Sequence, residues 1–407
     1  MSETQVSDDI KERVADFERA IPMSRFDEQA LAEFAGVPKG TLLFLRHFHE
    51  DNIRRWADGI GDLNPRFRDI DYARQTKYGR LVAPPLMLTS VCGEVIYLAV
   101  MKRKARAFHS GSDWEFFQPV LEGDTIDFEG QGLIDVKVVD SRYSGQMIVL
   151  TSEARYRNQR GELVGRVRGY ARESVGLAAS QKMGKNQAID LYKYSEAELQ
   201  KIEGDKDSEE MRGDLPRFWE DVNEGDTIGH IVLGPYTMMS SVGYYCAAPN
   251  AGGAVGERLH RYRTKHVARN LTFVDPRINA PVNGMLTHLD NEMSKAIGAP
   301  GAYDIGMERQ CLASILFNNW IGDDGHLWKF NIQFRQFVIY GDTNWYRGRV
   351  TKKYLEDGKC CVDVEFTGTN QREQLTTVGT ATVILPSREH GPVRYPTAPS
   401  SQKGAKS

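Results

Sequence analysis

Among the residues that could move a proton, His288 has the most informative neighbourhood. It stands in the run Thr287-His288-Leu289-Asp290, so a carboxylate follows two residues later. An imidazole changes its charge near neutral pH, and a nearby carboxylate can orient it or share its proton. The pair therefore suits acid–base chemistry, although Asp290 could equally cap the helical turn that follows it. A single histidine is more often a core or capping residue, so this interpretation needs support from its surroundings.

The other histidines and the cysteines do not predict a metal site. His47 and His49 alternate in a strand-like stretch and could share one face, but no third ligand follows at a suitable spacing. The five cysteines are an odd number and contain no C-x-x-C pair, which favours free thiols in a reducing compartment. We therefore expect a cytoplasmic protein without a metal.

Length and composition indicate a soluble globular chain of two domains. Its 407 residues exceed one ordinary core, and 41% of them are hydrophobic. A formal net charge of −3 provides no basic field that would attract nucleic acid or anionic lipid. No run of about 18 apolar residues occurs. We expect neither a nucleic-acid partner nor a membrane partner.

The chain contains an internal repeat. The run at 116–124, FFQPVLEGD, recurs at 334–342 as FRQFVIYGD, with five identical positions and one exchange of Leu for Ile. Asn-Gln-Arg at 158–160 recurs at 370–372. The offsets are 218 and 212 residues, and the order of the two matches is kept. This pattern indicates a duplicated unit.

Each half contains a helical region followed by strand-like segments. Content of β-branched and aromatic residues predicts strands within 112–124, 125–140, 145–159 and 162–173, and again within 326–341, 344–358, 359–371 and 373–386. One helix before an antiparallel meander predicts an α+β fold in which a sheet wraps a helix. We place the first domain at 1–175, a charged linker at 176–213, the second domain at 214–388 and a disordered tail at 389–407.

The segment before the first group of strands resembles the MaoC-like hydratase/dehydratase family, the R-specific enoyl-CoA hydratases. That family's signature is Gly-Asp-x-Asn-Pro-x-His-x-Asp-x-x-x-Ala. The matching residues are Gly61, Asp62, Asn64, Pro65, Asp69 and Ala73. Phe67 takes the place of the histidine, and Ala83-Pro84-Pro85 is similar to the FAS1-like dehydratase subgroup that has lost it. The resemblance implies a tandem double hotdog, in which each half is an antiparallel sheet wrapped around a central helix.

The second half resembles the same family through other residues. Thr287–Asp290 fits x-His-x-Asp, and the loop at 299–307 is similar to Leu-Pro-Gly-x-x-x-His-Gly-Met, with Gly306 at the family's glycine. The position of the family's aspartate falls on Asn250, or on Asn283 if no gap is allowed.

The resemblance implies addition of water to an enoyl-CoA thioester, or the reverse dehydration, without a separate cofactor because coenzyme A is part of the substrate. His288 would be the acid/base, and the amide of Gly306 at a helix start would bind the thioester oxygen. The remaining catalytic candidates are Asp290, Asn250 and Asp62, with Asp304 and Asp275 as further options for a second acid/base. Asp62 could equally be structural, since Asp before Asn-Pro is a good turn signal.

Substrate-binding candidates lie in an insertion just before His288 and around the two signatures. Arg261, Arg263 and Lys265 belong to a basic, aromatic run that could pair with the phosphates of coenzyme A, the alternative being a solvated loop. We expect Tyr303, Asp304 and Phe67 to line the acyl site.

Two other functions stay open on the sequence alone. The protein could be a non-catalytic acyl-CoA-binding subunit of a larger complex, because each half lacks part of the signature. It could also be a hotdog thioesterase that uses Glu94 or Glu308. A homodimer or higher homo-oligomer is expected in either case.

Overall fold

The computed structural model describes residues 8–20, 25–26, 45–91, 93, 107–141, 145–174, 189–248, 256–266, 272–296 and 299–399. The helices are α1 (Asp8–Ala20), α3 (Glu50–Ile60), α4 (Ile70–Gln75), α7 (Glu196–Asp207), α8 (Met238–Ala247), α9 (Glu257–His266), α10 (Asn291–Ala296) and α11 (Gly306–Ile321). Short 3-10 turns are η2 (Pro65–Phe67), η3 (Pro85–Ser90), η4 (Trp219–Asp221) and η6 (Gly284–His288). Within the described ranges no helix is long and apolar enough to cross a membrane.

The first-half strands are β1 (Arg25–Phe26), β2 (Ala107–Phe116), β3 (Ile126–Ser141), β4 (Gly145–Asn158) and β5 (Leu163–Ser174). The second half contributes β6 (Thr227–Leu233), β9 (His326–Phe334), β10 (Asn344–Glu356), β11 (Lys359–Asn370) and β12 (Leu375–Ile384), and a separate hairpin pairs β7 (Thr272–Asp275) with β8 (Ala280–Asn283). Seven of the eight long strands fall within one residue of the segments predicted from side-chain pattern, whereas β2 begins at Ala107, before the predicted segment at 112–124.

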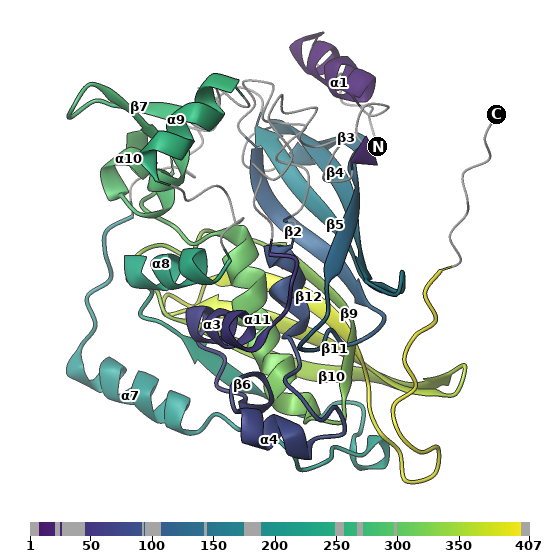
Figure 1. The fold of residues 1–407 in the computed structure, drawn as a ribbon. Coiled ribbons are helices and arrows are strands. Elements are labelled where there is room, and N and C mark those ends of the chain that lie inside the picture. Colours follow the sequence, from purple (N-terminus) through teal and green to yellow (C-terminus); the bar gives the residue numbers. More distant parts are fainter. Residues whose placement is uncertain are drawn as a thin grey trace, which may run out of the picture.

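One ten-stranded antiparallel sheet unites the two halves (Figure 1). Its order is β1-β3-β4-β5-β2-β9-β12-β11-β10-β6, so all first-half strands lie on one side of the β2–β9 junction. At that junction Asp113 pairs with Asn331, and the Asn331 side-chain amide donates to the Asp113 carboxylate. The two residues are 218 positions apart, which is the offset of the sequence repeat. A pseudo-twofold axis therefore passes through this pair, as in a dimer of two single hotdogs.

The central helix of the second half is α11, which lies against the sheet (Figure 1). It is buried almost all round, and its buried residues include Glu308, Arg309 and Asn318 as well as apolar side chains. Phe317 packs edge-on against Phe330 and Phe366, with ring centroids 5.8 and 5.2 Å apart. The first half has the corresponding helix start at η3, and residues 94–106 lie outside the described residues. The architecture confirms the expected double hotdog.

The remaining elements frame this core. The equivalent helices α3 and α8 pack side by side across the halves, where a β-carbon on Gly59 would lie only 2.6 Å from the carbonyl oxygen of Gly243. Helix α7 belongs to the segment predicted as a linker. Residues 389–399, which the sequence pattern assigns to a disordered tail, pack on the body instead: the Tyr395 hydroxyl lies 3.0 Å from that of Tyr78, and its ring stacks edge-on against His326.

Candidate active site at the start of the central helix

Gly306, the first residue of α11, has an amide that can donate to a ligand, and two neighbouring side chains lie close to its α-carbon. The first amides of a helix have no acceptor within the helix, and they carry partial positive charge. In the described part of the chain nothing accepts a hydrogen bond from the Gly306 amide. A β-carbon at this position would lie 2.5 Å from Nδ1 of His109 and 2.9 Å from the Phe334 ring. Only glycine fits here, and its amide can bind an oxygen that gains negative charge.

His288 ends η6 and is held against the same helix start. Its Nδ1 lies 2.8 Å from the carbonyl oxygen of Tyr303, and the two rings are 4.4 Å apart. A nitrogen that faces a carbonyl oxygen carries the proton, so the lone pair of the neutral ring is on Nε2. Burial lowers the pKa of His288 below its ordinary value. The imidazole is therefore neutral near pH 7, with Nε2 able to accept a proton.

A buried cluster of charged side chains packs at the start of this helix. Arg309 donates from Nε to Asp304 at 2.5 Å, and a second bond from the same guanidinium completes a bidentate pair. Another guanidinium nitrogen donates to the carbonyl oxygen of Gln336 at 2.7 Å. Asp304, expected from sequence to contact the substrate, has its carboxylate engaged by Arg309. Tyr303 is buried beside His288, and burial raises its pKa to about 12.

Equivalent β-bridges show that the first half lacks the amide donor. The bridges are Val82–Leu121 in the first half and Tyr303–Ile339 in the second. Three residues after each bridge a helix begins, at Pro85 in η3 and at Gly306 in α11. Proline has no amide hydrogen, so the first half cannot offer the hydrogen bond that Gly306 offers.

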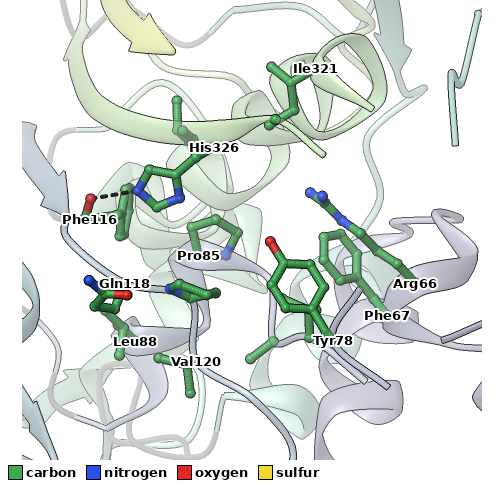
Figure 2. Close-up of a pocket in the computed structure, with 15 residues that line it drawn as sticks. Arg66, Phe67, Tyr78, Pro85, Leu88, Phe116, Gln118, Val120, Ile321 and His326 are labelled. Carbon is green, nitrogen blue, oxygen red and sulfur yellow. Dashed lines mark hydrogen bonds between the residues drawn. The ribbon is translucent and has the colours of Figure 1, made fainter. Parts of the chain in front are cut away.

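The first half also lacks the histidine. Phe67 is fully buried in an apolar cluster with Ala57 and Val82. Beside it lies a cavity of about 40 Å³, shown in Figure 2, which His326 enters from the start of β9. His326 donates from Nε2 to the carbonyl oxygen of Phe116 at 2.8 Å, and burial lowers its pKa to about 4. This cavity has room for roughly three water molecules, too little for an acyl group.

Matching turns identify the position of the family's aspartate in each half. Asn64 caps η2 by accepting a bond from the Arg66 amide at 3.1 Å, and Asn283 caps η6 by accepting one from the Met285 amide at 3.0 Å. Two residues earlier the first half has Asp62, whereas the second half has Pro281. The halves are thus complementary: one keeps the aspartate and the other keeps the histidine.

Asp62 does not join His288 in one site. It is fully buried and accepts bonds from the Asn64 amide at 3.0 Å and the Asn318 side chain at 2.9 Å. Twelve residues separate Gly306 from Asn318 in α11, which at about 1.5 Å per residue is about 18 Å. A proton cannot pass directly between groups at opposite ends of this helix. Burial raises the pKa of Asp62, and the bonds from Asn64 and Asn318 oppose that rise.

Replacing Asp62 by asparagine should therefore leave turnover unchanged within about threefold and cost about 1–3 kcal/mol of stability, the range for a disturbed buried hydrogen bond. Steady-state kinetics and urea unfolding of the same preparation measure both effects. A loss of turnover with unchanged stability would place Asp62 in the reaction.

The other predicted residues lie farther from the helix start. Asp290 caps α10 by accepting from the amides of Glu292 and Met293, and Arg277 donates to it at 2.8 Å. Asp275 is held by the same arginine. These carboxylates are thus engaged in local structure.

The coenzyme A candidates lie on α9 at the surface. Arg261 and Lys265 are exposed there. The side chain of Arg263 lies outside the described residues, as do Asn250 and Glu94. The second-half insertion that contains α9 stands beside the sheet in Figure 1. Among the described residues no group of three or more His, Cys, Asp or Glu side chains is arranged to hold a metal ion.

His109 is a residue of this site that sequence reasoning missed. It comes from β2 of the first half, and a register shift between His109 and Gly111 interrupts the strand's alternation. Such a bulge redirects a side chain, and here His109 packs on Gly306, with Nε2 3.0 Å from the carbonyl oxygen of Gly111. The sequence signal would have been Ser110-Gly111 within a strand, which is typical of a bulge.

Comparison with known proteins finds sequence similarity in the first half of the chain. A family model described as "FAS1-like, dehydratase domain region" matches residues 46–167. A UPF0336 protein of Parafrankia sp. (strain EAN1pec) is 29% identical over 119 residues, covering 28% of this chain and 75% of the relative. A UPF0336 protein of Streptomyces griseus subsp. griseus is 23% identical over 114 residues, covering 24% and 76%.

Solved structures extend the similarity to both halves. A structure described as "MaoC-like dehydratase" superposes with a TM-score of 0.57 at 17% identity, covering 83% of this chain and 94% of that one. This chain has the double-hotdog fold. A MaoC domain protein from Chloroflexus aurantiacus J-10-fl, described as a dehydratase, gives a TM-score of 0.51 at 13% identity, covering 84% and 93%.

In this double hotdog the region that matches the family model includes Asp62, Phe67 and Pro85 but not His288. The half that matches the dehydratase domain family by sequence is therefore the half without the histidine and the amide donor. The residues suited to chemistry lie in the other half, which shares the fold.

Proposed function

We propose that this protein adds water to an enoyl-CoA thioester, or removes it from a 3-hydroxyacyl-CoA, at the start of α11. The observation that carries the proposal is the bond between His288 Nδ1 and the Tyr303 carbonyl oxygen, three residues before Gly306. It brings a neutral imidazole to the helix start that has an unbonded amide. The dehydratase-type fold of the relatives supports the same reaction class.

The chemistry follows from these two groups. The thioester oxygen accepts a hydrogen bond from the Gly306 amide, which stabilises the negative charge that develops when water attacks C3. His288 Nε2 accepts the proton of that water. The same imidazolium then returns a proton to C2, so hydroxide and a proton are added across the double bond. Dehydration runs through the same steps in reverse.

Helix α9 supports recognition of the coenzyme A phosphates. His260 Nε2 lies 3.3 Å from the Thr272 hydroxyl, which ties α9 to the hairpin that leads to His288.

Replacing Arg261 and Lys265 together by alanine should raise KM for an enoyl-CoA about tenfold, because each lost charge contact costs about 0.2–1 kcal/mol at an exposed position. The KM for the matching enoyl-pantetheine, which lacks those phosphates, should not change. Equal effects on both thioesters would contradict phosphate recognition.

A second candidate function is non-catalytic binding of an acyl-CoA. Pro281 at the position of the family's aspartate favours it, because no carboxylate is supplied there to assist His288. Hydrolysis of the thioester is less favoured, since Glu308 is buried and accepts three hydrogen bonds within the protein.

One assay separates these functions. Purified protein is mixed with short, long, aromatic and steroidal enoyl-CoAs while absorbance of the enoyl thioester is followed, and a thiol reagent is added to a parallel sample. Loss of absorbance without free thiol supports hydration and identifies the acyl class. Free thiol indicates hydrolysis. Binding by calorimetry without either signal means that the protein is a binding subunit.

A further inference from the structure

Two buried carboxyl groups lie near one cation at the first turn of α11. Asp304 precedes the helix, Glu308 is in its first turn, and each is at most 4% exposed. Arg309 forms its bidentate pair with Asp304, and its remaining described bonds go to the carbonyl oxygens of Gln336 and Thr376. The arginine thus neutralises one carboxylate only.

The contacts of Glu308 converge on one oxygen. Oε2 accepts from the Tyr236 hydroxyl at 3.1 Å, from the Ser241 hydroxyl at 3.3 Å and from the Ile305 amide at 3.4 Å. The hydroxyls of Tyr236 and Ser241 also bond to each other. No bond to Oε1 is found among the described residues. The described partners of the Glu308 carboxyl group are thus uncharged groups, and the bonds of Arg309 go elsewhere.

The balance of buried charge indicates that Glu308 is neutral. Two ionised carboxylates with one guanidinium would leave an excess negative charge in a dry interior, which is costly. That charge would also lie within one helical turn of the Gly306 amide, where the proposed reaction develops an oxyanion. A neutral Glu308 can hold Tyr236, Ser241 and the Ile305 amide together without this repulsion.

We propose that Glu308 is a positioning residue that works as a neutral carboxylic acid and supports the start of α11 without adding negative charge to it. The role of the oxyanion in this inference rests on the proposed function, whereas the neutral state of Glu308 does not. Burial, followed by the charge of Asp304, raises the pKa of Glu308 to about 8. Ionisation above that pH should weaken binding of the oxyanion and reduce turnover.

The groups that face Glu308 come from every neighbouring element. Tyr236 lies just before α8, and Ser241 lies within it. Asp304 precedes α11, Arg309 lies in α11, and Tyr346 lies on β10. Both tyrosines have pKa values raised by burial, so neither ionises before Glu308 as pH rises. Arg309 remains charged throughout.

The test is Glu308→Gln, which keeps the shape of the neutral acid but cannot ionise. At pH 7 the variant should retain turnover within about threefold. Between pH 7 and 9.5 the wild type should lose turnover about tenfold or more, while the variant loses less than about twofold. A loss of about 100-fold at pH 7 would mean that the carboxylate itself is required. An unchanged alkaline decline in the variant would also overturn the proposal.

A stability measurement tests the neutral state without using activity. The unfolded chain releases the Glu proton near pH 4.3, and the folded protein keeps it up to about pH 8. The unfolding free energy should therefore fall as pH rises through this window, and the fall should be smaller in Glu308→Gln. Equal pH slopes would refute a neutral Glu308 even if no substrate is found. Glu153→Gln is the matched control, because buried Glu153 is paired with Arg155 and Arg168 and its pKa is lowered.

Discussion

Replacing His288 by glutamine should lower the rate of enoyl-CoA hydration about 10²- to 10⁴-fold, the range for loss of a general acid–base. Glutamine can still donate to the Tyr303 carbonyl oxygen, so the turn that ends at residue 288 should survive. It has no nitrogen that accepts a proton from water. The fall should appear in kcat, with KM changed little, because the side chain acts on water and not on the thioester. Circular dichroism and urea unfolding confirm that the fold is intact.

His326→Gln is the matched control for that variant. His326 is buried and His288 is half-buried, both donate to a backbone carbonyl oxygen at 2.8 Å, and both have pKa values lowered by burial. They lie at opposite ends of α11, and only His288 is near Gly306. His326→Gln should therefore keep its hydration rate within about threefold. Equal losses in both variants would mean that a buried histidine is needed for structure, and the catalytic assignment of His288 would fail.

The fold could be predicted from sequence because its main signals are local or repeated. Alternating strand residues depend on the neighbouring residues, and the repeat at 116–124 and 334–342 falls where β2 and β9 end. Two equivalent strands that meet at a pseudo-twofold axis produce the Asp113–Asn331 pair. The histidine was predictable for the same reason, since its motif is short and continuous.

The surroundings of the histidine could not be predicted, because they depend on residues far apart in the chain. Tyr236 reaches Glu308 across 72 residues, and His109 reaches Gly306 through the β2–β9 junction. Asp62 and His288 are separated because they contact opposite ends of α11. No local sequence motif predicts which end of the helix each of them contacts. In a duplicated fold, a signature residue in one half can thus contact the far end of the other half's helix.

Replacing Arg309 by leucine should produce the largest loss of stability, about 3–5 kcal/mol, as measured when one partner of a buried ion pair is removed. The change leaves Asp304 and Glu308 in the interior without a cation, and the carbonyl oxygens of Gln336 and Thr376 lose a donor. Urea unfolding at pH 7 measures the loss. The surface pair of Arg388 with Asp221 is the matched control, because it is also bidentate but both side chains are at least half exposed. Arg388→Leu should cost at most about 1 kcal/mol.

A double variant distinguishes lost charge pairing from lost packing. Asp304→Leu combined with Arg309→Met should recover much of the loss at pH 7, since replacing both members of a buried pair by apolar groups is often neutral. Recovery would show that the loss in Arg309→Leu comes from the unpaired charge of Asp304 and not from a packing defect. If the double variant is as unstable as Arg309→Leu, the arginine stabilises the start of α11 mainly through its bonds to the two carbonyl oxygens and not through its charge.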